Sequence, residues 1–192
     1  MDAIFEATIQ VLSSDGLLRL NTTRIARRAG VSVGTLYQYF PNKQALLFAV
    51  MDQHLAMLAD TIEKTCDGNL GATVETLAAA VVKAYLQAKM AQAEISPALY
   101  RIASELDARE LIDSTVRRST RAIETALSGA SDGRFVDTNL IAQTLTAALY
   151  GTVPAFCHKV LSPADGTEAE RQLTIMFRSY LVAQQRGIAE IR

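Results

Sequence analysis

The stretch from Asn21 to Lys43 constrains the fold more than any other part of the chain, because helix breakers divide it into two short segments. Asn21 or Thr22 can cap a helix that ends at Gly30, the residue type that most often takes the left-handed conformation at a helix end. Ser32 can cap a second helix, which Pro41 must stop. We therefore expect two helices of about two turns each, joined by a tight turn.

Three residues in this stretch have the spacing of a helix-turn-helix. Ala26 is small enough to let the two helices cross closely, Gly30 supplies the turn, and Leu36 can pack the second helix back on the first. Caps alone are common. A helix cap, the small residue, the turn glycine and the inward leucine, all in register, predict a helix-turn-helix unit.

The second helix then has a polar outer face. With Leu36 and Phe40 turned inward, helical geometry turns another set of side chains outward: Ser32, Val33, Thr35, Tyr37 and Gln38. Hydroxyls and amides hydrogen-bond base edges or phosphates, and a valine can meet a thymine methyl group. We expect this face to enter the major groove of DNA, and we expect Tyr39, unlike Tyr37, to belong largely to the core. Lys43, in the first turn after the Asn42 cap, can meet a phosphate together with free backbone amides.

Charge is unevenly distributed along the chain. The formal net charge is -1, yet no Asp or Glu lies between Gly16 and Met51. The same stretch contains five cations: Arg19, Arg24, Arg27, Arg28 and Lys43. A basic end on a slightly acidic chain is the pattern expected for contact with a polyanion, although a solvated charged face would give the same pattern.

The rest of the chain predicts helices, and we expect an all-α fold. A helix over residues 2–14 precedes the unit, and a long helix after Asn42 has apolar residues at spacings of three and four, from Leu47 to Ile62. Thr167 and Glu170 form a capping-box pattern, which predicts that the last helix begins there. We divide the chain into a DNA-binding domain at residues 1–45 and a larger helical domain at 46–192, joined by the long helix.

Location and redox state follow from composition. The chain has no uninterrupted apolar run that would span a bilayer and no basic-then-apolar signal segment at its start. Its two cysteines, Cys66 and Cys157, are far apart and suit reduced thiols. We expect a cytoplasmic protein that has no membrane segment.

The segment "TRIARRAGVSVGTLYQYFPNKQALL" resembles the DNA-binding domain of the tetracycline-repressor (TetR) family of bacterial transcription regulators. The resemblance covers about the first quarter of the chain. It implies an all-α homodimer that binds a palindromic operator and is released by a small molecule. It also implies that Ser32, Gly34 and Thr35 meet DNA, that Tyr37 and Lys43 contact phosphates, and that Thr23 and Arg24 lie near the start of the helix that crosses the backbone. Many relatives carry a basic arm before the first helix, and here either that arm is absent or Met1 is not the natural start.

Two further sites are expected in the larger domain. Several aromatic and polar side chains could line an apolar ligand pocket with a few hydroxyl groups, although core packing is the more common role for any one of them: Tyr85, Met90, Tyr100, Tyr150, Phe156 and His158. By resemblance, and by their small-residue and Met/Phe/Tyr stripes, the last two helices are expected to form the dimer seam. The seam residues are Thr144, Ala148, Gly151, Leu173, Met176, Phe177 and Tyr180.

Three alternatives stay open. An enzyme would need a nucleophile with a base, paired carboxylates or metal ligands, and neither His54 nor His158 lies in a metal-binding pattern, so we expect no catalytic residue, metal site or cofactor. A redox sensor that uses Cys66 or Cys157 would still bind DNA. A ligand-binding protein with a vestigial helix-turn-helix would not.

Overall fold

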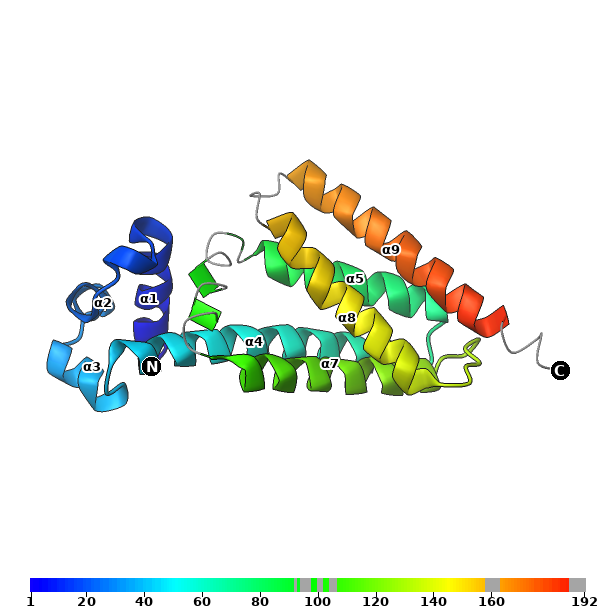
Figure 1. Cartoon of the computed structure of the whole chain (residues 1–192), viewed down its shortest axis with the longest axis horizontal. Coiled ribbons are helices and arrows are strands. Elements are labelled where there is room, and N and C mark those ends of the chain that lie inside the picture. Colours follow the sequence, from blue (N-terminus) through cyan, green and yellow to red (C-terminus); the bar gives the residue numbers. More distant parts are fainter. Residues whose placement is uncertain (92, 94–97, 100–101, 104–106, 158–162, 187–192) are drawn as a thin grey trace. The chain divides into compact units, whose positions relative to one another are not determined.

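The computed structural model describes residues 1–91, 93, 98–99, 102–103, 107–157 and 163–186, with only the backbone at 152–157, 163–165 and 186. Every regular element in these residues is a helix, which confirms the all-α prediction (Figure 1). The elements are α1 (Asp2–Asp15), a short 3-10 helix η1 (Leu17–Arg19), α2 (Thr22–Ala29), α3 (Val33–Tyr39), α4 (Lys43–Asp67), α5 (Val74–Met90), α7 (Arg109–Ser128), α8 (Thr138–Cys157) and α9 (Pro163–Arg186).

The chain forms two compact units. Unit 1 comprises residues 1–55 and 94–112, and unit 2 comprises residues 56–93 and 113–192. The expected domain division at residue 45 differs from this one in two respects. The first thirteen residues of α4 belong to unit 1, and so does a segment that follows α5 in the chain.

The core of unit 1 is built by α1, α2, α3 and the start of α4. Ile25, Leu36 and Leu46 are each fully buried in it. Ile102 and Ala108, from the segment after α5, pack in the same apolar cluster. The ring of Phe5 in α1 lies 5.8 Å from the ring of Phe40, which closes the cluster beside the end of α3.

The turn between α2 and α3 has the geometry that the sequence predicts. Gly30 has φ of +70°, and the N–H groups of Gly30 and Val31 donate to the carbonyls of Arg27 and Ala26 at 3.3 and 3.0 Å. These two bonds form the Schellman motif, in which a left-handed residue satisfies the last carbonyls of a helix. The Asn21 side chain caps α2 and the Ser32 side chain caps α3, as expected.

Helix α4 is the only described helix that is long and apolar enough, by length and composition, to cross a membrane. One face of it is buried instead: Leu46, Val50, Met51, Leu58 and Ile62 are each at most 2% exposed, whereas Phe48 on another face is 42% exposed. This burial is typical of a core helix in a globular protein.

Unit 2 packs α9 on α5 and α8, with α7 beside the last turns of α4 (Figure 1). Tyr85, Leu127, Leu149 and Phe177 are among its most deeply buried side chains. The prediction that the last helix begins at Thr167 is wrong, because α9 begins at Pro163. Proline suits the first helical position, where its missing N–H would have no partner in any case.

The Gly30 turn gives a stability prediction. Gly30→Ala should lower the free energy of unfolding by about 1 kcal/mol, because an L-residue is strained at positive φ. No atom lies within 4 Å of the added Cβ, so the cost is conformational and not a clash. Urea denaturation followed by helical circular dichroism measures it. Gly34→Ala is the matched control: it lies inside α3 and should stabilise by roughly 0.5 kcal/mol. Equal effects at the two positions would contradict the assignment.

Candidate nucleic-acid interface

The outward face of α3 is defined by what its other face buries. Leu36 is fully buried and Phe40 is 7% exposed, so the residues between them turn to the surface. Tyr37 is 46% exposed, which confirms its expected outward orientation, and Ser32, Gly34 and Gln38 are exposed. Val33 and Thr35 are half-buried at the edges of this face.

Two hydroxyls at the start of α3 are bonded to each other. The Ser32 hydroxyl oxygen accepts from the Thr35 backbone N–H at 2.9 Å and lies 2.8 Å from the Thr35 hydroxyl. Whichever hydroxyl donates, the pair keeps one O–H that can donate to a ligand. Ser32 therefore has a structural role as helix cap, and the pair presents a fixed donor at the first turn of α3.

The Tyr37 hydroxyl ties α3 to the start of α2. It lies 3.1 Å from the hydroxyl of Thr22, and this pair also keeps one O–H. Thr23 is exposed beside it. The expectation that Tyr39 belongs largely to the core is wrong, since 56% of Tyr39 is exposed. Phe40 occupies the inward position that follows Leu36 by four residues, and Tyr39 is left at the surface.

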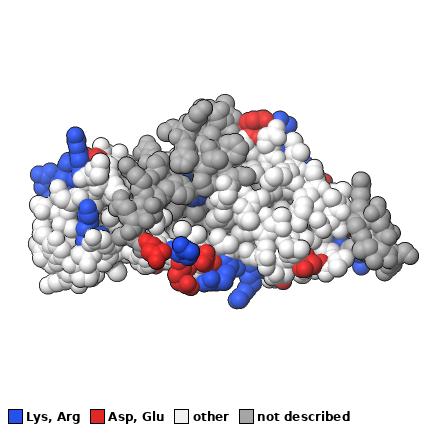
Figure 2. Space-filling model, viewed as in Figure 1, with Lys and Arg blue, Asp and Glu red and all other residues white. Residues whose placement is uncertain are grey.

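Two exposed cations of the basic stretch have partners within unit 1. Arg24 forms an ion pair with Asp15 of α1 at 2.7 Å, and Arg28 donates to the Gln10 side chain. Asp15 lies one residue before the acid-free stretch from Gly16 to Met51, so the distribution of charge along the chain did not indicate this ion pair. Within the described parts of the chain, no ion pair is recorded for Arg19, Arg27 or Lys43. The visible surface of unit 1 shows blue groups with little red, whereas red and blue lie together along α4 and α7 (Figure 2).

Lys43 is the first residue of α4. The Asn42 side chain caps this helix, accepting from the Ala45 N–H at 2.8 Å. The backbone N–H groups of the first helical turn have no partner inside the helix, and they carry the positive end of its dipole. Lys43 and this helix end together provide one place where an anion can bind.

The expected ligand residues are only partly brought together. In unit 2 the rings of Tyr85 and Tyr150 lie 4.9 Å apart, and the Tyr150 hydroxyl is 2.9 Å from that of Ser119, a residue the sequence analysis missed. Burial raises the pKa of Tyr150, which keeps the phenol protonated. Met90 packs against Gly166 so closely that a Cβ there would lie 2.6 Å from its sulfur. Tyr100, His158 and the side chain of Phe156 lie outside the described residues.

The expected dimer residues divide by exposure. Thr144, Gly151 and Met176 are exposed, while Ala148 and Tyr180 are half-buried. Leu173 and Phe177 are 4% and 1% exposed. These two side chains are part of the core of unit 2, so they offer little surface to a partner.

Cys66 is buried in α4 with 1% exposure. Burial raises the pKa of its thiol to about 12, and the carboxylates of Asp67 and Glu63 add to the effect. The thiolate is the reactive form, so burial and the raised pKa both lower the reactivity of this cysteine in the folded protein. The side chain of Cys157, like that of His158 beside it, lies outside the described residues. Among the side chains that the structure does describe, no three of His, Cys, Asp and Glu come together as a metal site would require.

Two family models match the chain. The model described as "Bacterial regulatory proteins, tetR family" matches residues 4–50, and "Tetracyclin repressor-like, C-terminal domain" matches residues 73–181. The second match alone covers more than half of the chain.

Individual proteins are also similar to the chain. The nucleoid occlusion factor SlmA of Actinobacillus pleuropneumoniae is 35% identical over 102 residues, which are 52% of this chain and 46% of SlmA. The transcriptional regulator HbdR of Aromatoleum sp. is 33% identical over 135 residues, 69% of this chain and 58% of HbdR. The matches thus span about half the length of these curated relatives. The structure of FadR from Bacillus subtilis in complex with stearoyl-CoA has the same fold, with a TM-score of 0.68, 19% identity and coverage of 92% and 96% of the two chains.

The buried thiol gives a test of the redox alternative. At pH 8 the Cys66 thiol should not react with Ellman's reagent while the protein is folded, because its pKa near 12 leaves it protonated. It should react at once in urea. A Cys66→Ser variant identifies any folded-state reaction that belongs to Cys157. Rapid native reaction that is lost in this variant would contradict the assignment.

Proposed function

The chain belongs to the tetR family of bacterial regulatory proteins, and from this membership we propose that it is a repressor that binds a palindromic operator as a homodimer and is released by a small, largely apolar ligand. Membership of this family supports a DNA-binding transcription regulator. HbdR, and the FadR of similar fold, are both named as transcriptional regulators.

One observation carries the proposed mode of DNA binding. The short helix α3 has a fully buried leucine on one face and an outer face that presents hydroxyls, an amide and no acid. In our proposal α3 enters the major groove, where Gln38 reads a base edge, the Ser32–Thr35 pair donates one O–H, and Val33 meets an apolar group. Gly34 lacks a side chain and lets the backbone approach the DNA closely.

Phosphate contacts would fix the register of α3 without reading sequence. We assign them to Lys43 with the start of α4, to the Tyr37 hydroxyl, and to Thr23 at the start of α2. Arg24 contributes less than its charge suggests, because Asp15 already compensates that charge. Acidic side chains are missing from this surface for a physical reason: a carboxylate would face the phosphates.

The ligand would bind in unit 2. Tyr85 and Tyr150 supply an aromatic wall, and the Tyr150–Ser119 hydroxyls supply a polar group beside it. Met90, Tyr100, Phe156 and His158 remain proposed lining residues. The stearoyl-CoA bound to the FadR of similar fold supports a ligand with a long apolar part. An apolar cavity with a few placed polar groups is the usual form of such a site.

A homodimer would form through α8 and α9. Both helices keep apolar side chains at the surface, and Leu140, Ile175, Met176 and Val182 are each at least 41% exposed. Thr144, Ala148 and Gly151 on α8 are small and permit close approach, and Tyr180 lies on α9. A two-fold axis would pair these faces with their counterparts. We also propose a cytoplasmic location, where the DNA target lies.

Removal of the Lys43 charge tests the phosphate contact. Lys43→Ala should weaken binding to the DNA upstream of the protein's own gene and reduce the salt slope of log K by about 1 per subunit, since one phosphate contact is lost. Fluorescence anisotropy from 50 to 300 mM KCl measures the slope. Lys83→Ala is the matched control, because it removes one exposed lysine from unit 2. Equal slopes for the two variants would contradict the assignment.

A charge on the proposed seam tests the dimer. Met176→Glu should raise the dimer dissociation constant by about thirtyfold or more, because the charge must be buried or the seam opened. Sedimentation velocity over a range of concentrations measures the constant. Leu18→Glu, at a side chain that is 93% exposed in unit 1, should leave the dimer intact. A Met176→Glu protein that dimerises as tightly as the original would exclude this part of the seam.

A further inference from the structure

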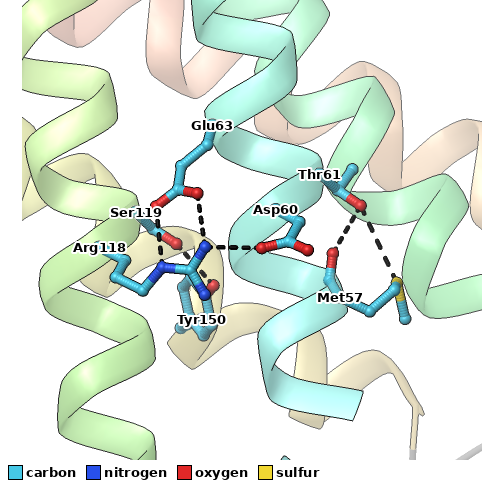
Figure 3. Close-up of polar contacts among 7 residues, drawn as sticks. All are labelled: Met57, Asp60, Thr61, Glu63, Arg118, Ser119 and Tyr150. Carbon is cyan, nitrogen blue, oxygen red and sulfur yellow. Dashed lines mark hydrogen bonds and ion pairs between the residues drawn. The ribbon is translucent and has the colours of Figure 1, made fainter. Parts of the chain in front are cut away.

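Two adjacent residues of α7 contact two different helices (Figure 3). Arg118 points to α4: its Nε donates to Oε1 of Glu63 at 2.9 Å, and its Nη2 donates to Oδ1 of Asp60 at 2.6 Å and to Oε2 of Glu63. Ser119 contacts Tyr150 of α8 through the hydroxyl pair at 2.9 Å. All of these residues belong to unit 2.

The Arg118 contact is more specific than an isolated surface ion pair. Exposed pairs contribute little, because water screens them and long side chains lose freedom. Here one guanidinium contacts two carboxylates, and both oxygens of Glu63 accept from it in a fork geometry that fixes direction. The bonds to Glu63 and Asp60 raise the pKa of Arg118 further above its already high value. The contact therefore fixes a stretch of α7 to one turn of α4.

The Ser119 contact lies deeper in the unit. Ser119 is fully buried, and Tyr150 also packs its ring on Tyr85 of α5. A displacement of the Tyr150 hydroxyl must leave the Ser119 hydroxyl unsatisfied or move it, and an unsatisfied buried polar group is costly. Ser119 follows Arg118 directly in α7. A displacement of the Ser119 backbone therefore also displaces the backbone of Arg118.

We propose that Arg118 is a positioning residue that passes a change at the Tyr150–Ser119 hydrogen bond to the Asp60–Glu63 turn of α4. The proposal rests on the proposed function in one respect: the change at the Tyr150–Ser119 hydrogen bond would be the response to a bound ligand that contacts Tyr150. Helix α4 supplies residues 43–55 to unit 1 and residues 56–67 to unit 2, and α7 supplies residues 109–112 to unit 1 and residues 113–128 to unit 2. The Arg118 contact therefore joins the two described helices that both units share.

Amide hydrogen exchange of the free protein tests the coupling, because it measures local opening without DNA or ligand. Tyr150→Phe removes only the hydroxyl and keeps the ring on Tyr85. It should speed the exchange of amides in residues 56–67 by about threefold or more. In an Arg118→Gln background the same substitution should leave these amides unchanged within error, because the connection to α4 is already lost. Peptides from α7 should respond to Tyr150→Phe in both backgrounds.

Two further variants make the result decisive. Arg121→Gln removes a charge one turn along α7, where no bond to α4 is recorded among the described residues, and it should keep the full α4 response. Glu63→Gln breaks the fork from the α4 side at constant size, and it replaces Arg118→Gln if that variant does not fold. An α4 response of equal size with and without the fork would overturn the proposal. The proposal would also be overturned if Tyr150→Phe alone, with Arg118 and Glu63 intact, did not change the exchange of the α4 amides.

The outcome can be separated from that of the proposed function. If DNA binding fails but exchange in α4 depends on Arg118, the coupling stands and the proposed function falls. If DNA binds and the exchange effects of the two substitutions simply add, the proposed function stands and Arg118 does not carry the signal.

Discussion

The packing of Leu36 across the Gly30 turn is the interaction on which the rest of unit 1 depends. Leu36 is fully buried against a cluster that includes Ile25 and Ala26, and Gly30 allows the chain to reverse with its carbonyls satisfied. This contact fixes the rotation of α3 about its own axis. Once that rotation is set, the positions of Ser32, Tyr37 and Gln38 at the surface follow from helical geometry.

The same packing gives the residues of the seven-residue helix α3 different roles: the inward side chains hold the helix in place, and the outward ones are left to contact DNA. Several polar groups of the candidate interface already have partners within unit 1: Ser32 caps α3, Tyr37 contacts Thr22, and Arg24 pairs with Asp15. These partners hold the side chains in place before DNA is bound, which lowers the conformational entropy lost on binding. In unit 2 the Arg118 fork and the Tyr150–Ser119 pair hold α7 to its neighbours in a comparable way.

Local features could be predicted from the sequence, and long-range contacts could not. The caps at Asn21 and Ser32, the turn at Gly30 and the buried Leu36 depend on residues within a few positions of one another. The exposure of Tyr39, the Arg24–Asp15 pair and the packing of Ile102 in unit 1 depend on where separate helices meet. The start of α9 is a different case. Ser162-Pro163 carries a helix-start signal, but Thr167 with Glu170 offered a competing one, and only the structure distinguishes them.

The central claim is that the outer face of α3 reads base sequence. Selection of binding sites from a pool of randomised duplexes, carried out with the original protein and with Gln38→Ala, tests it most directly. A side chain that reads a base changes specificity at one position, whereas a phosphate contact changes affinity for all sequences alike. The account predicts a palindromic consensus, with the preference at one symmetric pair of positions lost in the Gln38→Ala variant and the other positions kept. An identical consensus for both proteins, or no enriched sequence at all, would contradict it.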